Sequence, residues 1–335
     1  MAAEQGLPLY NSVARQTSAV LIRSYSTSFG LASRLLAART RMQIETIYAL
    51  VRLADEIVDG VAAEARIPAA DIAAVLDELE AETERAMRTG YSVNLVVHAF
   101  ALTARETGIG TDLTGPFFAS MRADLAQTEH TEASFDEYVY GSAEVVGLMC
   151  LQCFLQGIPV PEDQAKRLRE GAQRLGAAFQ KVNFLRDLAQ DFETLGRSYF
   201  PGITVTAFTE ADKNRILDGI DADLLVSGGA VAELPPGCRA AVVLAQELFT
   251  ELARRLRNTP AEALRTTRVR VPNPVKARIA ARALVTRRVS APTAAAAVAP
   301  LRGAAGTEPR PTNASDSTNA PDSTNAPDSM NGQHP

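Results

Sequence analysis

Residues 48–60 read YALVRLADEIVDG and place a narrow polar stripe on an otherwise apolar helical segment. At about 100° per residue, the side chains of Tyr48, Arg52, Asp55 and Asp59 fall within about 60° of the helix circumference. The apolar side chains on the far side are Leu50, Leu53, Ala54 and Ile57. This pattern predicts a helix that buries its apolar face and turns two carboxylates, one helical turn apart, toward a cavity.

A second segment, residues 180–201, reads QKVNFLRDLAQDFETLGRSYFP and repeats the arrangement. The same arithmetic places Gln180, Asn183, Asp187 and Asp191 within about 80° of one another. The apolar residues opposite them are Val182, Leu185, Leu188 and Phe192. Two such helices face to face would aim all the carboxylates of both pairs into one cavity.

The two acidic pairs indicate a divalent-metal site for a diphosphate substrate. Acidic residues four apart commonly belong to a solvated helix face, where they repel each other by roughly 0.2–0.5 kcal/mol. Because the pattern is repeated, each time with an amide or an arginine on the same stripe, it calls for a compensating cation. Magnesium takes oxygen ligands from carboxylates, waters and phosphates, so an Asp site without His or Cys favours Mg²⁺ over zinc.

The composition predicts an all-α fold with one large domain. Of the 335 residues 46% are hydrophobic, none is Trp, and long stretches have apolar residues at i, i+3, i+4 spacing. A polar repeat, DSTNAP, begins at Asp316, so we predict a domain over residues 1–302 and a disordered tail over 303–335. The net charge of −5 and the lack of basic and aromatic clusters argue against nucleic acid as a partner.

Glycine, proline and capping residues divide the domain into helices. We expect helices at residues 12–36, 41–59, 69–88, 92–106, 113–126, 135–155, 162–192, 210–225, 237–257 and 274–286. A turn is expected at residues 157–162, and Gly and Pro keep residues 195–202 out of a helix. Arg197 and Tyr199 lie in the latter segment, where a loop is predicted to close over bound phosphate.

The remaining features predict a cytoplasmic protein. Cys150 and Cys153 lie in the apolar segment VVGLMCLQCFL, which favours buried thiols over a metal or redox site. The first residues lack the apolar run of a signal peptide, and the apolar stretch at 145–154 is too short to span a bilayer. Residues 265–302 hold nine Lys and Arg and no acid, which is typical of a solvated basic face or of a surface that meets phosphate or lipid.

Five ordered motifs, within residues 15–290, resemble those of the squalene and phytoene synthases, the head-to-head trans-isoprenyl diphosphate synthases. Residues 48–60 and 180–201 resemble the two aspartate-rich motifs of that family. SYSTSFGLASRLL (24–36), MRADL (121–125) and YVYGSAEVVGLM (138–149) are similar to its S-x-S-F, M-x-x-D and Tyr/Gly-rich segments. The first motif departs from the family's D-D-x-x-D, because its second position is Glu56, about 100° from Asp55 around the helix.

The resemblance implies a single-domain isoprenoid-synthase helical bundle around a central cavity. It implies that Mg²⁺, or Mn²⁺ in its place, is bound by Asp55, Asp59, Asn183, Asp187 and Asp191. It implies that the diphosphates and the entrance for the first substrate are contacted by Ser26, Ser28, Phe29, Arg52, Gln180, Arg186, Arg197 and Arg268. Tyr48, Tyr138 and Tyr199 are implied to guide the cation and the proton, although plain aromatic packing explains these three equally well.

The implied reaction joins two prenyl diphosphates through a cyclopropylcarbinyl diphosphate, with release of diphosphate. The chain most resembles bacterial phytoene synthases of carotenoid biosynthesis, which implies geranylgeranyl diphosphate as substrate, proton loss as the last step and no NADPH. Two alternatives stay open: a C15-specific enzyme that makes dehydrosqualene or squalene from farnesyl diphosphate, and a non-catalytic assembly factor. Release of a lipophilic product implies peripheral contact with the inner face of the membrane.

Overall fold

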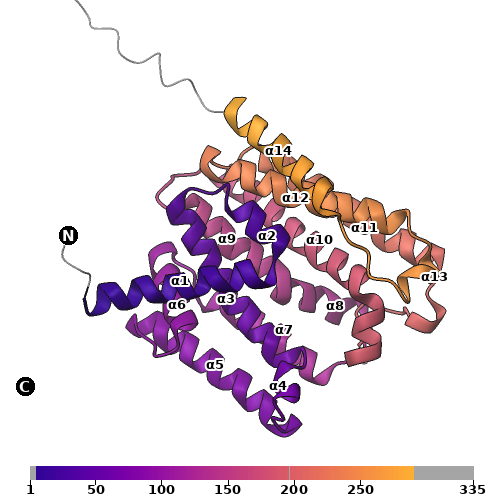
Figure 1. Ribbon diagram of the computed structural model, residues 1–335, viewed down its shortest axis with the longest axis horizontal. Coiled ribbons are helices and arrows are strands. Elements are labelled where there is room, and N and C mark those ends of the chain that lie inside the picture. Colours follow the sequence, from indigo (N-terminus) through magenta and orange to yellow (C-terminus); the bar gives the residue numbers. More distant parts are fainter. Residues whose placement is uncertain (1–4, 196, 290–335) are drawn as a thin grey trace, which may run out of the picture. The chain divides into compact units, whose positions relative to one another are not determined.

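The fold is helical throughout the part of the chain that the computed structural model describes, residues 5–195 and 197–289, without the side chains at 69, 191–195 and 285–289. In this part the only β pairing is an isolated parallel bridge between Glu129 and Ser198 (Figure 1). All the described elements belong to one compact unit, Met1–Pro292. The prediction of a single-domain, all-α fold is confirmed, and the predicted tail, 303–335, lies outside the described residues.

The helices follow one another through short connections. Their bounds are α1 Leu7–Tyr25, α2 Thr27–Ser33, α3 Ala38–Val58, α4 Val61–Glu64, α5 Ala69–Thr89, α6 Leu95–Thr107, α7 Thr111–Ala126, α8 Glu132–Val139, η1 Tyr140–Glu144, α9 Val145–Leu155, α10 Glu162–Leu195, η2 Val205–Ala207, α11 Glu210–Val231, α12 Pro236–Arg257, α13 Ala261–Leu264 and α14 Asn273–Val289.

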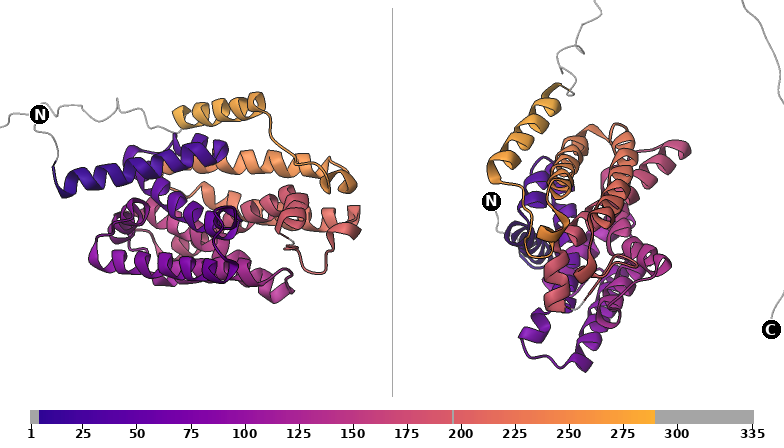
Figure 2. Two further views of the ribbon diagram at one scale, coloured as in Figure 1. Left: turned by 60° about the horizontal axis from the view of Figure 1, so that its bottom comes forward. Right: turned by 90° about the vertical axis from the view of Figure 1, so that its right-hand side faces the viewer.

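The last helix of the continuous run α8–η1–α9 contacts both helices that carry the acidic motifs. α9 packs against α3, α7 and α10, while α11 lies along α10 (Figure 1). Apolar clusters fill the space on both sides: Leu185, Leu217 and Leu256 are fully buried in one, and Leu50, Phe100 and Phe118 in another. Figure 2 shows the same packing from two further directions. The core therefore fixes where α3 and α10 lie, and their polar stripes remain outside it.

Two of the expected helices are interrupted in the structure, and the helix expected over 210–225 continues to Val231. The helix expected over residues 12–36 is interrupted at Ser26, whose backbone is extended (φ −134°, ψ 115°) and whose side chain accepts a hydrogen bond from the Phe29 N–H. A serine that caps a new helix in this way competes with continuation of the preceding one. The helix expected over 135–155 contains a π-helical segment, Tyr140–Glu144, which hydrophobic periodicity does not reveal.

The π-helix is packed so closely that a larger residue does not fit at Gly141. A Cβ atom there would lie 2.1 Å from Ser120 Oγ and 2.2 Å from the Pro116 carbonyl oxygen. We therefore expect Gly141→Ala to lower the free energy of unfolding by about 2 kcal/mol, measured by urea denaturation. Gly219→Ala in α11 is the control, since nothing lies within 4 Å of its Cβ position; it should leave the protein as stable or more stable. Equal stability of the two variants would contradict the packing described.

α9 and its cysteines are largely buried in the fold, as the sequence predicts for the thiols. Cys153 and Cys238 are buried and Cys150 is half-buried, and all are free thiols. Burial raises the pKa of Cys150 to about 12, so this thiol stays protonated. By length and composition alone, Glu132–Leu155 could cross a membrane. However, 56% of its most apolar 18-residue stretch is buried inside the fold, as it is in a core helix.

Candidate active site

α3 carries the first acidic motif and is amphipathic, as the sequence predicts, but of the residues predicted on its apolar side Leu53 and Ile57 are only half-buried. Its inner face is formed by Leu50, Ala54 and Val58, all at most 5% exposed. On the other side, Tyr48, Arg52 and Asp55 are half-buried. Asp59 follows as the C-cap residue of α3, with 42% of its side chain exposed. The stripe therefore reaches solvent at the C-terminal end of the helix.

Asp55 lies among other acidic side chains. Burial and, next, the charge of Asp59 raise the pKa of Asp55 to about 8, while Arg52 lowers it and Asp124 and Glu56 raise it further. Burial likewise raises the pKa of Asp59, against the opposing effect of Arg197. When partly buried carboxylates repel one another, a cation placed between them stabilises their ionised form most strongly.

Glu56, the residue that departs from the family motif, positions Arg52. Its carboxylate accepts a hydrogen bond from Arg52 Nε at 2.6 Å and a second from Arg52 Nη2. The guanidinium group also lies over the ring of Tyr25, 4.5 Å from its centroid. Arg52 is thus held at the edge of the stripe by an ion pair and a cation–π contact.

Asp124 of α7 is a site residue to which the sequence expectation gave no role, although it belongs to the quoted motif MRADL. It is 8% exposed and accepts hydrogen bonds from the hydroxyl groups of Tyr138, at 2.7 Å, and Tyr199, at 3.1 Å. Burial raises the pKa of Asp124 to about 6, although Arg197 and the two tyrosines oppose the rise. The sequence signal that could have identified Asp124 is its position on the buried face of an otherwise apolar helix.

Arg197 connects the loop after α10 to the end of α3. Its Nη2 donates to the Val58 carbonyl at 2.8 Å, and its Nη1 lies 3.3 Å from Asp59 Oδ1 and 3.5 Å from Asp124 Oδ1. Ser198 next to it donates its N–H to the Thr128 carbonyl at 2.8 Å. The segment after the second acidic motif is non-helical, as predicted, and it is fixed against the first motif.

The second acidic motif lies on α10, where Gln180, Asn183 and Asp187 are half-buried on one side, opposite buried Val182, Leu185 and Leu188. Asp187 is held between two arginines: Arg186 donates Nε to Oδ1 at 2.9 Å, and Arg268 Nε lies 2.6 Å from the same oxygen. The structure thus brings two of the four predicted phosphate-binding arginines, Arg186 and Arg268, to the same carboxylate. The side chain of Asp191 lies outside the described residues.

Further cations surround this motif. Burial, and then the positive charges of Arg186 and Arg270, lower the pKa of Lys276 in α14. Lys276 Nζ also donates to Thr27 Oγ1 of α2 at 2.7 Å. Mutual repulsion among these groups favours binding of an anion. The sequence expectation included Arg186 and Arg268 but missed Lys276, which carries no motif of its own.

Aromatic side chains connect the two acidic helices on the side of α2. The ring of Phe29 lies 6.4 Å from that of Tyr48 on α3, 5.7 Å from Phe179 on α10 and 5.5 Å from Phe249 on α12. Of the serines expected at the substrate entrance, Ser26 caps α2 and Ser28 is half-buried within it. Phe29 and Arg197 therefore link α3 to α10 and to the loop that follows it.

The residues present fit a magnesium ion that is completed by a substrate. Among the described side chains, no three His, Cys, Asp or Glu groups come close enough to form a metal cage by themselves. Asp55 and Asp59 nevertheless offer carboxylate oxygens only, in a place where their charges repel. Magnesium commonly binds to one or two carboxylates and takes its other ligands from water and phosphate.

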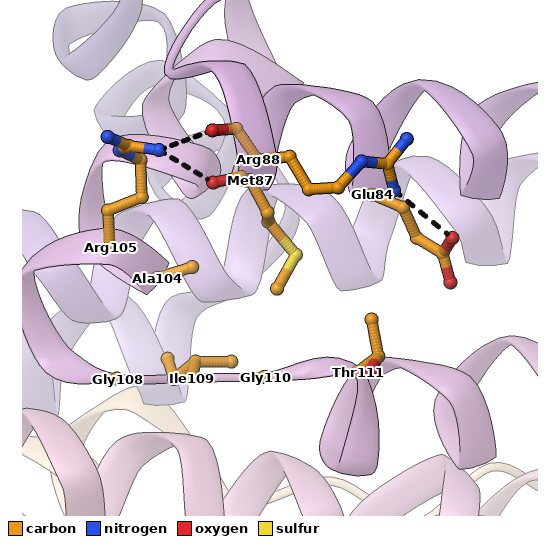
Figure 3. A pocket seen from close by; sticks show the side chains of 9 residues that line it. All are labelled: Glu84, Met87, Arg88, Ala104, Arg105, Gly108, Ile109, Gly110 and Thr111. Carbon is orange, nitrogen blue, oxygen red and sulfur yellow. Dashed lines mark hydrogen bonds and ion pairs between the residues drawn. The ribbon is translucent and has the colours of Figure 1, made fainter. Parts of the chain in front are cut away.

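A hollow of about 570 Å³ lies away from these motifs, between the ends of α5 and α6 and the start of α7 (Figure 3). Arg105 closes one side of it by donating to the carbonyl groups of Met87, at 3.0 Å, and Arg88, at 2.7 Å. None of the acidic or aromatic residues expected at the site lines this hollow. It offers neither a carboxylate cluster nor a buried cation, so we do not assign the chemistry to it.

Relatives of known type share sequence with this chain. A 15-cis-phytoene synthase of Paracoccus sp. (strain N81106 / MBIC 01143) is 28% identical over 263 residues, 74% of this chain and 84% of that protein. Phytoene synthase 3, chloroplastic, of Zea mays is 32% identical over 204 residues, 59% of this chain. The matched region spans 44% of the maize protein.

Solved structures and a family model identify the fold and the family. A crystal structure of a dehydrosqualene synthase in complex with ligand has a TM-score of 0.68 at 20% identity, covering 84% of this chain and 99% of that one. Squalene synthase HpnC from Alicyclobacillus acidocaldarius has a TM-score of 0.63 at 20% identity, covering 76% and 98%. These similarities show a helical isoprenoid-synthase fold. The family model described as Squalene/phytoene synthase matches residues 22–274, and the chain belongs to this family.

Proposed function

We propose that this protein is a 15-cis-phytoene synthase, which condenses two molecules of geranylgeranyl diphosphate head to head. Its family makes it a prenyltransferase that acts on prenyl diphosphates. The proposed product is phytoene, formed through the cyclopropyl intermediate prephytoene diphosphate with release of diphosphate, in carotenoid biosynthesis. The match to a 15-cis-phytoene synthase over 84% of that protein supports this choice among the family's reactions.

The observation that carries the proposal is the linkage of the two acidic helices. Arg197, from the loop after α10, pairs with Asp59 at the end of α3, and Phe29 contacts aromatic rings on both helices. Carboxylates, cations and an aromatic wall thus belong to one region. Ionisation of an allylic diphosphate needs these three kinds of group: a charged clamp for the departing diphosphate and an apolar, electron-rich surface for the carbocation.

We infer that Mg²⁺, or Mn²⁺ in its place, is held by Asp55, Asp59, Asn183, Asp187 and Asp191. When bound, the ion supplies positive charge that stabilises the departing diphosphate. Binding of the ion and the diphosphate requires Asp187 to exchange its present partners, which frees Arg186 and Arg268 to donate to phosphate oxygens. Lys276 adds a third cation from α14.

The tyrosines are proposed to act as neutral hydroxyl groups. Burial is the main reason that the pKa of Tyr48 is raised to about 12 and that of Tyr138 well above its ordinary value. Neither phenol therefore ionises near neutral pH, and each remains a neutral hydroxyl group that can donate and accept hydrogen bonds. Tyr138 and Tyr199 both donate to Asp124, so they are fixed in place beside the loop that carries Arg197.

The proposed activity is tested by incubating the purified protein in detergent with geranylgeranyl or farnesyl diphosphate, with and without Mg²⁺ and NADPH. We expect a C40 hydrocarbon of the mass of phytoene from the C20 substrate, no dependence on NADPH and complete loss of product with EDTA. Preference for the C15 substrate would instead identify a dehydrosqualene or squalene synthase. Failure to release diphosphate from either substrate would identify a non-catalytic assembly factor.

We also propose a cytoplasmic location, with peripheral contact at the inner face of the membrane for release of the hydrocarbon. A C40 product has almost no solubility in water, so it has to leave the enzyme into lipid. Comparison of the soluble and membrane fractions of lysed cells, with the hydrocarbon measured in each, tests this location.

A further inference from the structure

The outward face of α1 carries three exposed apolar side chains, with the exposed Gln16 between them. Leu9, Val13 and Val20 are 47%, 40% and 54% exposed, and at about 100° per residue they lie within about 40° of one another. The opposite side of α1 packs on α3 and α6 (Figure 1) and buries Ala14, Ser18 and Ile22. The stripe therefore points away from the core. It is a second set of apolar side chains on a helix that packs on the rest of the fold through its other face.

The loop between α5 and α6 extends this apolar surface. Tyr10 of α1 donates its hydroxyl to the carbonyl groups of Ser92, at 2.8 Å, and Val93, at 3.1 Å. Two large side chains of this loop are exposed, Tyr91 at 51% and Val93 at 75%. Leu7 and Tyr25 of α1 are exposed as well, but at about 100° per residue they lie on the other side of the helix from Leu9, Val13 and Val20. The outward face of α1 and the loop thus hold five of the fourteen exposed large hydrophobic side chains in the described part of the chain. Such a concentration marks an interaction surface rather than scattered exposure.

The charges around the α1 surface are positive. Residues 7–44 contain Arg15, Arg23, Arg34, Arg39 and Arg41 and no acidic residue, in a protein whose net charge is −5. Glu106 pairs with Arg15 at 2.8 Å and approaches Arg39 at 3.7 Å, and Glu45 lies near Arg23 and Arg41. On the loop side, Glu82 accepts a hydrogen bond from Ser92 Oγ, so three acidic side chains lie near the surface, against the five arginines of residues 7–44. An apolar helix face bordered by arginines fits the interface of an anionic lipid bilayer.

The C-terminal end of α1 leads to the candidate active site on the side of the helix away from the outward stripe, because Tyr25 lies about 140° around the helix from Val20. Tyr25, the last residue of α1, is 50% exposed and lies under the guanidinium group of Arg52. The next helix begins after Ser26, and its Phe29 packs against Tyr48. A lipid layer in contact with the outward face of α1 would therefore lie about one helix diameter, roughly 10 Å, from the expected entrance of the prenyl chains.

We propose that α1 and the α5–α6 loop dock this protein on an anionic lipid bilayer, so that prenyl chains pass between the membrane and the site. This inference rests on the proposed function, because it assigns the surface to lipophilic substrates and product. A second copy of the chain is the competing partner. A two-fold interface through this face would set the same arginines against one another, so the charges favour anionic lipid.

The test measures co-sedimentation with vesicles of phosphatidylcholine, with and without phosphatidylglycerol. Wild type should sediment with the anionic vesicles, and less so at high salt. The variant Leu9→Gln/Val13→Gln/Val20→Gln should bind about tenfold more weakly. It should keep wild-type turnover in detergent, because these side chains belong to none of the three buried apolar clusters and have no role assigned to them at the candidate site. Gln is also a good helix former, so α1 should stay folded.

The matched control is Leu225→Gln/Val226→Gln in α11, where the same kind of change is made at side chains that are 79% and 43% exposed. That helix carries Asp218 and Asp221 near the change, and the control should bind vesicles as wild type does. Equal binding of wild type and the α1 variant, or a wild-type dimer that the α1 variant separates in sedimentation, would overturn the proposal. Absence of product in detergent would instead count against the proposed function alone.

Discussion

Replacement of Asp55 by Asn is expected to lower kcat by at least about 10³-fold, while the protein remains folded. The amide keeps the size of the carboxyl group but removes the negative charge that would bind the metal ion. A factor of 10³ corresponds to about 4 kcal/mol of transition-state stabilisation, which is within what a bound metal ion contributes to a departing diphosphate. Steady-state release of diphosphate, at saturating Mg²⁺ and substrate, measures the effect.

The stability of the same variant separates loss of chemistry from loss of fold. Because the pKa of Asp55 is raised to about 8 in the folded protein, the metal-free wild type loses stability as the pH rises toward 8. The Asn variant lacks this loss, so at pH 8 it should melt at or above the wild-type temperature. Asp77→Asn is the control, because the Asp77 side chain is exposed and its carboxylate pairs with Arg122 of α7. The turnover of this control variant should stay at the wild-type level. Retention of turnover by Asp55→Asn would contradict the assigned role.

Replacement of Arg197 by Ala should have the largest effect on stability, a loss of about 3 kcal/mol in the free energy of unfolding. The change leaves Asp124 buried without its cation and removes the donor to the Val58 carbonyl. The loss should be larger at pH 8 than at pH 5, because Asp124, whose pKa is about 6, becomes neutral at the lower pH. Urea denaturation at the two pH values measures it.

Arg167→Ala provides the comparison for Arg197→Ala. Arg167 donates two hydrogen bonds to the carboxylate of Glu233, but the Arg167 side chain is 56% exposed. Water solvates both charges when an exposed ion pair is broken. Arg167→Ala should therefore lower the free energy of unfolding by less than about 1 kcal/mol, with little dependence on pH. If the two variants lost the same stability, the buried network around Asp124 would not hold the loop as described.

The acidic helices could be predicted from sequence because their pattern is local. The expected ranges 41–59 and 162–192 correspond to α3, Ala38–Val58, and α10, Glu162–Leu195. The apolar sides of these helices are set by the 3.6-residue period, so the polar stripes followed from arithmetic. The loop after α10 could also be predicted, because glycine and proline exclude a helix there.

Features that depend on tertiary contacts could not be predicted in this way. The role of Asp124 comes from Tyr138, Tyr199 and Arg197, which are distant in sequence and meet it only in the fold. The pairing of Asp187 with Arg268 spans 81 positions, so the sequence suggested a phosphate ligand where the structure has an ion pair. The break at Ser26 was missed because its side-chain cap outweighs a continuous apolar pattern.

Carboxylates of α3 and α10 are proposed to hold a metal ion, which in turn holds the diphosphate. This arrangement is tested by titrating Mn²⁺ in the presence and absence of a non-hydrolysable thio-analogue of geranylgeranyl diphosphate, following free Mn²⁺ by electron paramagnetic resonance. We expect that the analogue tightens Mn²⁺ binding, that Mn²⁺ tightens analogue binding by the same factor, and that Asp55→Asn abolishes this coupling. Binding of the analogue with the same affinity with or without the metal ion would contradict it.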